Sequence, residues 1–402
     1  MSLFSTVVED RPYADARTHL TADSQKGCRG GRVALVLCNV QPSEPMDKKV
    51  TVIENATVLV SKELEPVRGA DVVFSGERIG GIGPRAKVGV TGEVERVDAT
   101  GLVLTPGFID AHVHIGLASP PEVLERGVTT VRDLAWPPEI IFEMAERSRH
   151  VDFDGPEIVA AGPMLTAPGG YPTRATWAPP GTGRPVTSAQ EARPAVGETA
   201  DAGAVVVKFA LNPEVGPVLD AATLKEIVEA AHERGLKTTG HVSGLTELDK
   251  AIAARADELA HMLMSPEQIP QATIEKMVAT GMAIVPTLAV RFGRDRAFAI
   301  ENLARFRAAG GTVVYGTDLG NRGPGPGIDE EEVRGMTEAG FSAREIIASA
   351  TVTSSAWLGL TDRGTLEVGR KADIVAFPPA VQNDPSLLSD VRMVWRSGRR
   401  AF

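Results

Sequence analysis

The sequence predicts an α/β protein whose main part is a parallel (β/α)8 TIM barrel, joined to a small β-sandwich domain. Three observations support this fold class. Short apolar runs alternate with helical stretches across residues 105–363, as parallel β/α units require. Strand-and-turn patterns fill residues 50–104 and 364–402, on either side of that region. The glycine-rich phosphate loop that is typical of an open doubly wound sheet does not follow the first strand.

Eight apolar runs are the expected barrel strands. They are residues 108–114, 128–133, 157–162, 204–210, 236–241, 257–261, 282–287 and 312–318. The stretch "TLKEIVEAAHERG" shows how a helix separates two of them, because its apolar residues recur with helical spacing from Leu224 to Ala231. Thr223 and Glu226 form a capping-box pattern at its start, and Gly235 is expected to end the helix.

The two strand-rich ends, residues 50–104 and 364–402, are expected to form one composite sandwich domain. Neither end has enough strands to be stable alone, which is the physical reason for joining them. Residues 1–49 show no regular pattern, so they are expected to be an N-terminal arm outside the regular core. Regular alternation begins directly after Met46.

The amino-acid composition limits the cellular location and the binding partners that we expect for the chain. Its 402 residues carry a formal net charge of −10, which would be repelled by nucleic acid phosphates and anionic lipid. No apolar run approaches a membrane span, and the first residues lack the basic start and apolar block of a secretory signal. Cys28 and Cys38 are too few for a disulfide framework. We expect a cytoplasmic protein that binds neither nucleic acid nor membrane.

Polar side chains at the ends of the expected strands are the main indication of function. In "GFIDAHVH", Asp110, His112 and His114 fall on one face of a strand, because side chains alternate. Similar residues lie at the ends of four later strands: Lys208, His241, His261 and Asp318. Taken singly, such a residue is more often structural than a ligand. Four of the seven histidines nevertheless end barrel strands, where barrel active sites lie, so we expect these groups to converge.

The types of residue that converge suit zinc or a similar divalent transition ion. Imidazole and carboxylate groups are common zinc ligands. Lys208 fits this setting only as a neutral amine, which is the form that burial favours. A neutral amine reacts with carbon dioxide to give a carbamate, and the two oxygens of a carbamate are able to bridge two cations. Such a reaction would turn Lys208 into an anionic ligand with two oxygens.

Six pieces of the sequence resemble motifs of the amidohydrolase superfamily. They are "PGFIDAHVH", "VVVKFA", "TTGHVSG", "DELAHM", "VYGTDLG" and "GTLEVGRKADIVAF". The resemblance covers roughly residues 50–402. The chain is most similar to the branch that contains imidazolonepropionase-like proteins, metal-dependent prolidases and Xaa-Arg dipeptidases, through "AAHERGLKTTGH" and "ATVTSSAWLGL". Several ordered motifs in one chain make the match specific for the superfamily.

The resemblance implies two divalent metal ions, which are held by six side chains. They are His112, His114 and Asp318 for the more buried ion, His241 and His261 for the second ion, and carboxylated Lys208 as the bridge. The ions would share a hydroxide that attacks the substrate, while Asp318 takes its proton and passes it to the leaving nitrogen. Asp110 is expected to support the ligands from behind.

The long loop after the third strand, "PMLTAPGGYPTRATWAPPGTGRP", is a candidate lid because it is rich in proline and glycine. Tyr171 and Arg174 in this loop are the expected contacts to a substrate carboxylate or carbonyl, and Arg291 or Arg322 in later loops are alternatives. Each is explained equally well as a solvated loop residue. The stretch "FALNPEVGP" after Lys208 departs from the glycine-containing stretch of dipeptidase relatives, so a dipeptide substrate is not assigned.

The leading interpretation is a binuclear metal-dependent hydrolase of an amide bond in a small molecule or dipeptide-like compound. The alternative is a mononuclear deaminase or cyclic-amide hydrolase on the same barrel. Members of that type usually lack the strand-four lysine and carry glutamate three residues after the strand-five histidine, whereas this chain has Lys208 and Gly244. Lactone or phosphoester hydrolysis stays open, because it needs the same activated water. A non-catalytic scaffold is disfavoured because every ligand position is filled, and a homo-oligomer is compatible with the family.

Overall fold

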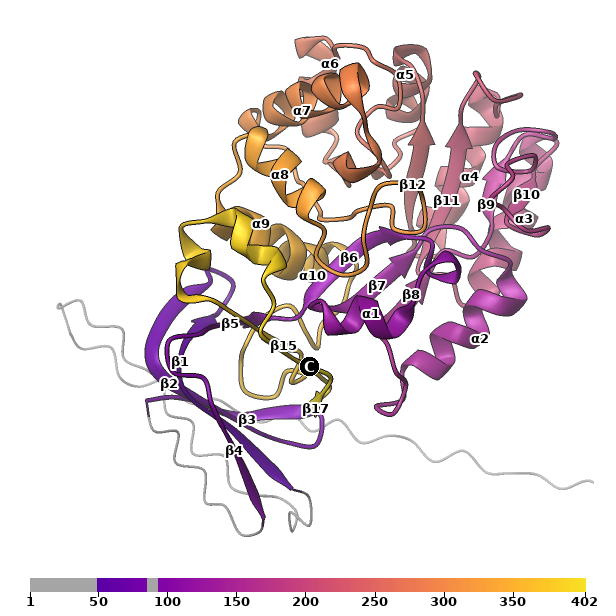
Figure 1. The fold of residues 1–402 in the computed structure, drawn as a ribbon. Coiled ribbons are helices and arrows are strands. Elements are labelled where there is room, and N and C mark those ends of the chain that lie inside the picture. The colour runs from indigo at the N-terminus through magenta and orange to yellow at the C-terminus, as the bar shows by residue number, and fades with distance from the viewer. Residues whose placement is uncertain (1–48, 85–92) are drawn as a thin grey trace, which may run out of the picture. The chain divides into compact units, whose positions relative to one another are not determined.

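The computed structural model describes residues 49–84 and 93–402 (Figure 1). The chain from Met46 onward belongs to one compact unit, so its two strand-rich ends and its central region are described together. The expected N-terminal arm, with Cys28 and Cys38, lies outside the described residues apart from Lys49. None of the helices in the described ranges combines the length and the apolar character that crossing a lipid bilayer requires.

Strands from the two ends of the described chain pair in one eight-stranded sheet. Its N-terminal strands are β1 (Val50–Val60), β2 (Glu65–Ser75), β3 (Arg78–Gly83), β4 (Val94–Asp98) and β5 (Val103–Pro106). Its C-terminal strands are β15 (Ile374–Phe377), β16 (Met393–Arg396) and β17 (Arg399–Arg400). The two ends of the chain meet where β15 pairs antiparallel with β5 (Figure 1). Buried side chains from both ends, such as Val58 and Trp395, share one apolar core. A separate two-layered sandwich domain stays a prediction.

The central region contains parallel strands that fall into two sheets. The first sheet holds β6 (Phe108–Val113), β7 (Val128–Asp133) and β8 (Glu157–Ala160). The second holds, in spatial order, β10 (Gly183–Pro185), β9 (Met164–Thr166), β11 (Val206–Leu211), β12 (Lys237–Val242), β13 (Glu258–Leu259) and β14 (Ala283–Ile284). The first seven expected barrel strands therefore each contain a strand, and the short pair β9 and β10 in the loop after β8 was not expected.

The last of the eight expected strands is not a regular strand, so the described residues do not form one closed eight-stranded sheet. Backbone hydrogen bonds still hold this segment between β14 and β6. Val314 donates to Ile284, and Ala111 donates to Tyr315, each over 2.9 Å. The segment ends at Asp318, whose φ of 62° is left-handed and does not continue a strand. The prediction is corrected to a TIM-barrel-like α/β domain in which an irregular segment takes the last strand position.

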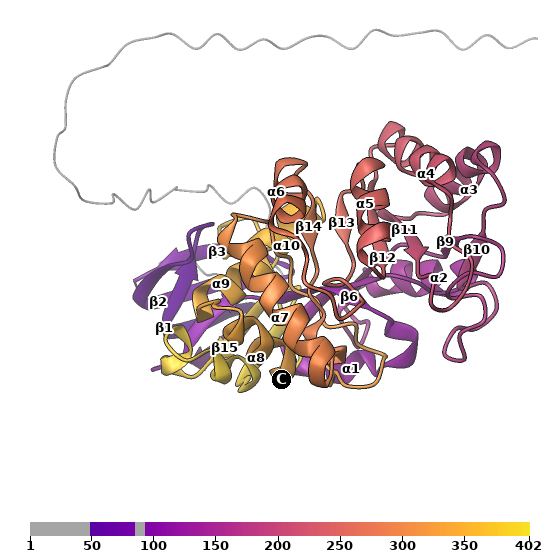
Figure 2. The same ribbon diagram turned by 90° about the horizontal axis from the view of Figure 1, so that it is seen from above.

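Helices alternate with the central strands along the described chain. They are α1 (Pro120–Glu125), α2 (Pro138–Ser148), α3 (Ala189–Asp201), α4 (Ala221–Glu233), α5 (Leu245–Ala253), α6 (Gln271–Ala279), α7 (Gly293–Ala308), α8 (Glu330–Glu338), α9 (Ala343–Ala348) and α10 (Ser354–Trp357). Figure 2 shows α3 to α6 along one side of the strands β9 to β14. This alternation of strands and helices is the one expected for β/α units.

Helix α4 confirms the expected apolar face and corrects its expected start. Leu224 and Ile227 are fully buried, as the helical spacing predicts. The helix begins after Asp220, whose carboxylate accepts a hydrogen bond from the backbone N–H of Thr223 over 2.8 Å. The predicted capping box at Thr223 is therefore wrong, because aspartate three residues earlier already satisfies this N–H group.

Candidate metal centre

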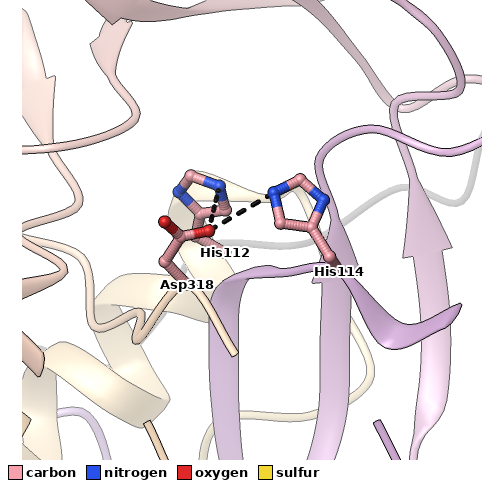
Figure 3. A group of neighbouring side chains, drawn as sticks. All are labelled: His112, His114 and Asp318. Atoms are coloured by element: carbon pink, nitrogen blue, oxygen red, sulfur yellow. Dashed lines mark ion pairs between the residues drawn. The ribbon is translucent and has the colours of Figure 1, made fainter. Parts of the chain in front are cut away.

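Three buried side chains, His112, His114 and Asp318, form a group of possible metal ligands. Nε2 of each histidine lies 3.3 Å from Oδ1 of Asp318, and the three ligand atoms lie within 4.8 Å of one another. Figure 3 shows the two imidazole rings and the carboxylate pointing toward a common centre. Two imidazole nitrogens and one carboxylate oxygen are a donor set that suits zinc. This group is the candidate metal centre.

The second ring nitrogens determine which atoms of the two histidines face this centre. Nδ1 of His112 lies 2.7 Å from the carbonyl oxygen of Ala260, and Nδ1 of His114 lies 3.2 Å from that of Ala135. A carbonyl oxygen only accepts, so each Nδ1 donates its proton and leaves Nε2 toward the centre. Burial lowers the pKa of His112, so that ring stays neutral. Burial also opposes protonation of His114, but the hydrogen bond and charge of Asp318 raise its pKa overall.

Asp110 positions the backbone on both sides of the centre without touching an imidazole ring. Its Oδ1 accepts from the backbone N–H of His112 over 3.0 Å and from that of Thr317 over 3.1 Å. Its Oδ2 accepts from the Thr317 hydroxyl over 2.6 Å. Burial raises the pKa of Asp110 to about 7. One carboxyl group therefore ties β6 to the residue before Asp318, and the supporting role expected for Asp110 stays a prediction.

A second pair of buried histidines lies next to the first group. Nδ1 of His241 is 3.1 Å from Nε2 of His261, and Nδ1 of His261 is 2.9 Å from the hydroxyl of Thr287. The ring centroids of His112 and His261 are 4.6 Å apart, and Oδ2 of Asp318 is 3.8 Å from Nδ1 of His261. Burial lowers the pKa of both His241 and His261, which keeps these rings in the neutral form that binds metal.

Lys208 on β11 is fully buried, and its Nζ has no hydrogen-bond partner among the described residues. Burial lowers the pKa of its ammonium group to about 7, although the charge of Asp318 acts in the opposite sense. The charge of Lys208 in turn lowers the pKa of His112 and His241, beyond the larger effect of burial. The amine therefore lies within electrostatic range of both histidine groups. A buried amine without a partner is unfavourable by itself.

Aromatic rings from the loop between β9 and β10 cover two of the histidines. The ring of Tyr171 stacks on His241 with a centroid distance of 4.5 Å and an interplanar angle of 28°. The ring of Trp177 lies 4.6 Å from that of His114. Burial raises the pKa of the Tyr171 hydroxyl, so this group stays neutral. Arg174, the other expected contact in this loop, is exposed.

Sequence reasoning missed several side chains that contact this cluster. Besides Trp177 and Thr287, they include Asn212, whose Nδ2 lies 3.1 Å from Nε2 of His241, and Asn321, whose Nδ2 donates to Oδ1 of Asp318 over 2.8 Å. Each asparagine follows a predicted ligand by three or four residues in the sequence, which was the available signal. The structure thus brings together five predicted ligands, His112, His114, His241, His261 and Asp318, and stacks Tyr171 on His241. The roles of these residues as ligands stay predictions.

The pattern of the Amidohydrolase family matches residues 103–401, which is most of the chain. The chain belongs to the amidohydrolase family. The predicted resemblance to the amidohydrolase superfamily is thereby confirmed, and the protein is a hydrolase of this family.

Proteins of three kinds are similar in sequence to this amidohydrolase. An uncharacterized protein of Mycobacterium tuberculosis is 27% identical over 372 residues, which cover 83% of this chain and 88% of the relative. Adenine deaminase 2 of Rhizobium etli is 28% identical over 365 residues, and the match covers 83% of this chain but 54% of that enzyme. Imidazolonepropionase of Deinococcus deserti is 31% identical over 188 residues, which are 44% of each chain. This amidohydrolase therefore spans about half the length of the matched adenine deaminase.

Solved structures of prolidases have the same fold. A putative prolidase from Bifidobacterium longum superimposes with a TM-score of 0.74 at 22% identity, over 89% of this chain and 95% of that one. A prolidase complexed with N-methylphosphonate-L-proline has a TM-score of 0.72 at 21% identity, over 87% and 99% of the two chains. At these identities the likeness establishes the fold alone, and it supports the TIM-barrel-like description of the central region.

Proposed function

We propose that this protein is a binuclear metal-dependent amidohydrolase that cleaves a carbon–nitrogen bond in a small molecule or dipeptide-like substrate. The observation that carries the proposal is the buried amine of Lys208, which has no partner among the described residues and acts electrostatically on the surrounding histidines. A polar group in such a place is unfavourable unless something from outside binds it. Carboxylation of the neutral amine and two cations would supply that partner.

The donor atoms around Lys208 fit two zinc-type ions. Nε2 of His112 is buried and has no hydrogen-bond partner in the described ranges, as expected of an atom that binds a cation. His114 and Asp318 would complete the first donor set, and His241 with His261 would form the second. Nitrogen and oxygen ligands of this kind suit zinc. A carbamate on Lys208 would add one oxygen to each set.

The chain itself supplies a base and a dry environment for hydrolysis. Bound cations would contribute Lewis acidity, which polarises a carbonyl group and makes water more acidic. Oδ1 of Asp318 accepts the hydrogen bond of Asn321, so Oδ2 is the oxygen that would take a proton from water and return it to the leaving nitrogen. The rings of Tyr171 and Trp177 would limit the access of bulk water to this reaction.

Deamination is the second candidate, because the match to adenine deaminase extends over 83% of this chain. The residue three positions after His241 is Gly244, which has no side chain to act as an acid or base. This absence of a carboxylate favours amide hydrolysis over deamination. Release of ammonia from adenine by the purified protein would reverse that preference.

Metal analysis and a lysine variant test the proposal together. Purified protein should contain about two equivalents of zinc per chain, whereas one supports the deaminase alternative and none supports a scaffold. Lys208→Ala should lose most of its metal and its activity on N-acyl amino acids or dipeptides, and added short-chain carboxylates should partly restore both. Lys237→Ala on the neighbouring strand is the control, since that amine already donates to the carbonyl of Trp357 over 2.9 Å. Full metal and full activity in Lys208→Ala would contradict the bridging role.

Assembly into a homo-oligomer and a cytoplasmic location stay predictions.

A further inference from the structure

Arg291 differs from the other arginines that the sequence offers for an anionic group of the substrate. Arg174 and Arg322 are exposed. Arg291 is 6% exposed, which is the same fraction as for Asp318. The small exposed fraction of Arg291 therefore equals that of the aspartate that we expect to meet the substrate. Arg291 is therefore a candidate for contact with a bound molecule.

Arg291 is held by backbone carbonyl groups and not by a carboxylate. Its Nη1 donates to Met264 over 3.1 Å, and its Nη2 donates to Met262 and, over 3.3 Å, to Leu263. In the described part of the chain its Nε has no hydrogen-bond partner and no carboxylate lies within ion-pair distance. A buried positive charge without a counter-charge is unfavourable unless a ligand supplies one. The guanidinium fork is also the group that best matches a carboxylate.

The position of Arg291 relative to the histidines follows from these contacts. The carbonyl groups that hold it belong to the residues directly after His261. Burial lowers the pKa of His241 and His261, and the charge of Arg291 lowers both further. Burial lowers the pKa of Arg291 itself to about 10, against the effect of the Asp318 charge. The guanidinium therefore lies against the three residues that directly follow His261 in the chain.

Apolar rings cover a different part of the same cluster. Trp177 lies against His114, on the strand β6 side, and Tyr171 stacks on His241. The two rings are themselves neighbours, with centroids 6.2 Å apart. A molecule bound between these rings and Arg291 would meet an apolar surface at one part of the site and a positive charge at another.

We propose that Arg291 binds a carboxylate of the substrate, and that the substrate is an N-acyl amino acid or a dipeptide with an apolar side chain. This inference rests on the proposed hydrolase function and names the substrate class for it. Hydrolysis adds water across the amide bond and releases a carboxylic acid and an amino acid, and the amino acid keeps the carboxylate that Arg291 holds. Tyr171 and Trp177 contact the apolar part of the substrate.

Two substrates that differ only in the carboxylate test the role of Arg291. Zinc-loaded wild type should hydrolyse N-acetyl-L-phenylalanine with a kcat/KM about 10- to 100-fold higher than for N-acetylphenethylamine, the range expected for one charged hydrogen-bonded contact. Arg291→Gln should lose most of this preference, because its kcat/KM should fall far more on N-acetyl-L-phenylalanine than on the neutral amide, while Arg291→Lys should keep part of the preference. The control is Arg322→Gln, which removes an exposed arginine and should leave the preference unchanged. An equal loss on both substrates would mean that Arg291 only supports the segment after His261, and it would overturn the proposal.

A binding measurement gives a readout that does not depend on turnover. In calorimetric titrations L-phenylalanine should bind to zinc-loaded wild type about tenfold or more tightly than phenethylamine does, and Arg291→Gln should remove the difference. Failure of L-phenylalanine to bind, or a ratio that Arg291→Gln leaves unchanged, would overturn the carboxylate site. An Arg291-dependent ratio without hydrolysis of either amide would support the site and overturn the proposed hydrolysis. Zinc content measured on each variant shows whether the metal centre is intact.

Discussion

Replacing Lys208 by methionine should stabilise the metal-free protein, although it removes a residue that we expect to be essential. The side chain is fully buried, and burial lowers the pKa of its ammonium group from 10.5 to about 7. A shift of this size disfavours the charged form by about 5 kcal/mol, at roughly 1.4 kcal/mol per pKa unit. Methionine has a similar length and no group that needs a hydrogen bond. We expect Lys208→Met to raise the free energy of unfolding at pH 7 by about 3–5 kcal/mol.

The pH dependence of this effect has a defined sign. From pH 7 up to about pH 10 the unfolded chain binds a proton at Lys208 that the folded chain does not bind. The stability of the wild type therefore rises with pH across this window, as far as Lys208 determines it. The advantage of Lys208→Met is largest at and below pH 7 and becomes smaller toward about pH 10.

Urea denaturation of chelator-treated protein, followed by circular dichroism at pH 7 and near pH 9, measures both effects. Lys237→Met is the matched control, because that amine donates to the carbonyl of Trp357 over 2.9 Å and lies 4.9 Å from the centre of its ring. Lys237→Met should lower the free energy of unfolding by about 1 kcal/mol, whereas Lys208→Met should raise it. A Lys208→Met protein no more stable than wild type, or an advantage that does not change with pH, would refute the desolvation argument. Added zinc should stabilise the wild type more than Lys208→Met.

Two further predictions concern the surroundings of the centre. Arg132 and Glu258 form a buried ion pair with a distance of 2.6 Å, so Arg132→Met should lower the free energy of unfolding by about 3–5 kcal/mol, and adding Glu258→Gln should recover much of this loss. Equal urea midpoints for wild type and Arg132→Met would contradict the argument. Asn321→Ala removes the hydrogen bond to Asp318 and should weaken zinc binding about 10-fold in a chelator competition. Unchanged zinc affinity would show that Asn321 does not orient the carboxylate.

The strand register explains why the candidate ligands are recognisable from the sequence. Asp110, His112 and His114 alternate with apolar residues, so a buried strand must direct all three to one face. The structure agrees, because the side chains of His112 and His114 meet Asp318 while Asp110 bonds to the backbone beside them. The alternation of polar and apolar residues along a strand involves only neighbouring positions, so it can be recognised from the sequence alone.

The irregular eighth segment and the contacting side chains were not predictable in the same way. The run that ends at Asp318 has the composition of a strand, but the left-handed backbone at this residue turns the chain out of regular pairing. Trp177 and Asn212 lie in loops, where no periodicity indicates which way a side chain points. Their contacts with the histidines depend on where the loops lie above the strands.

The sequence by itself determined the family, the expected order of strands and helices, and the set of side chains that could hold metal. Those properties depend on residue types and on spacings within single segments. Only the tertiary structure decided that two aromatic rings cover two of the histidines. Among the described residues, it also decided that Lys208 has no hydrogen-bond partner and that buried Arg291 has no carboxylate within ion-pair distance. The burial of a side chain and its polar partners depend on segments that are distant in the chain and meet only on folding. A local sequence pattern therefore does not indicate them.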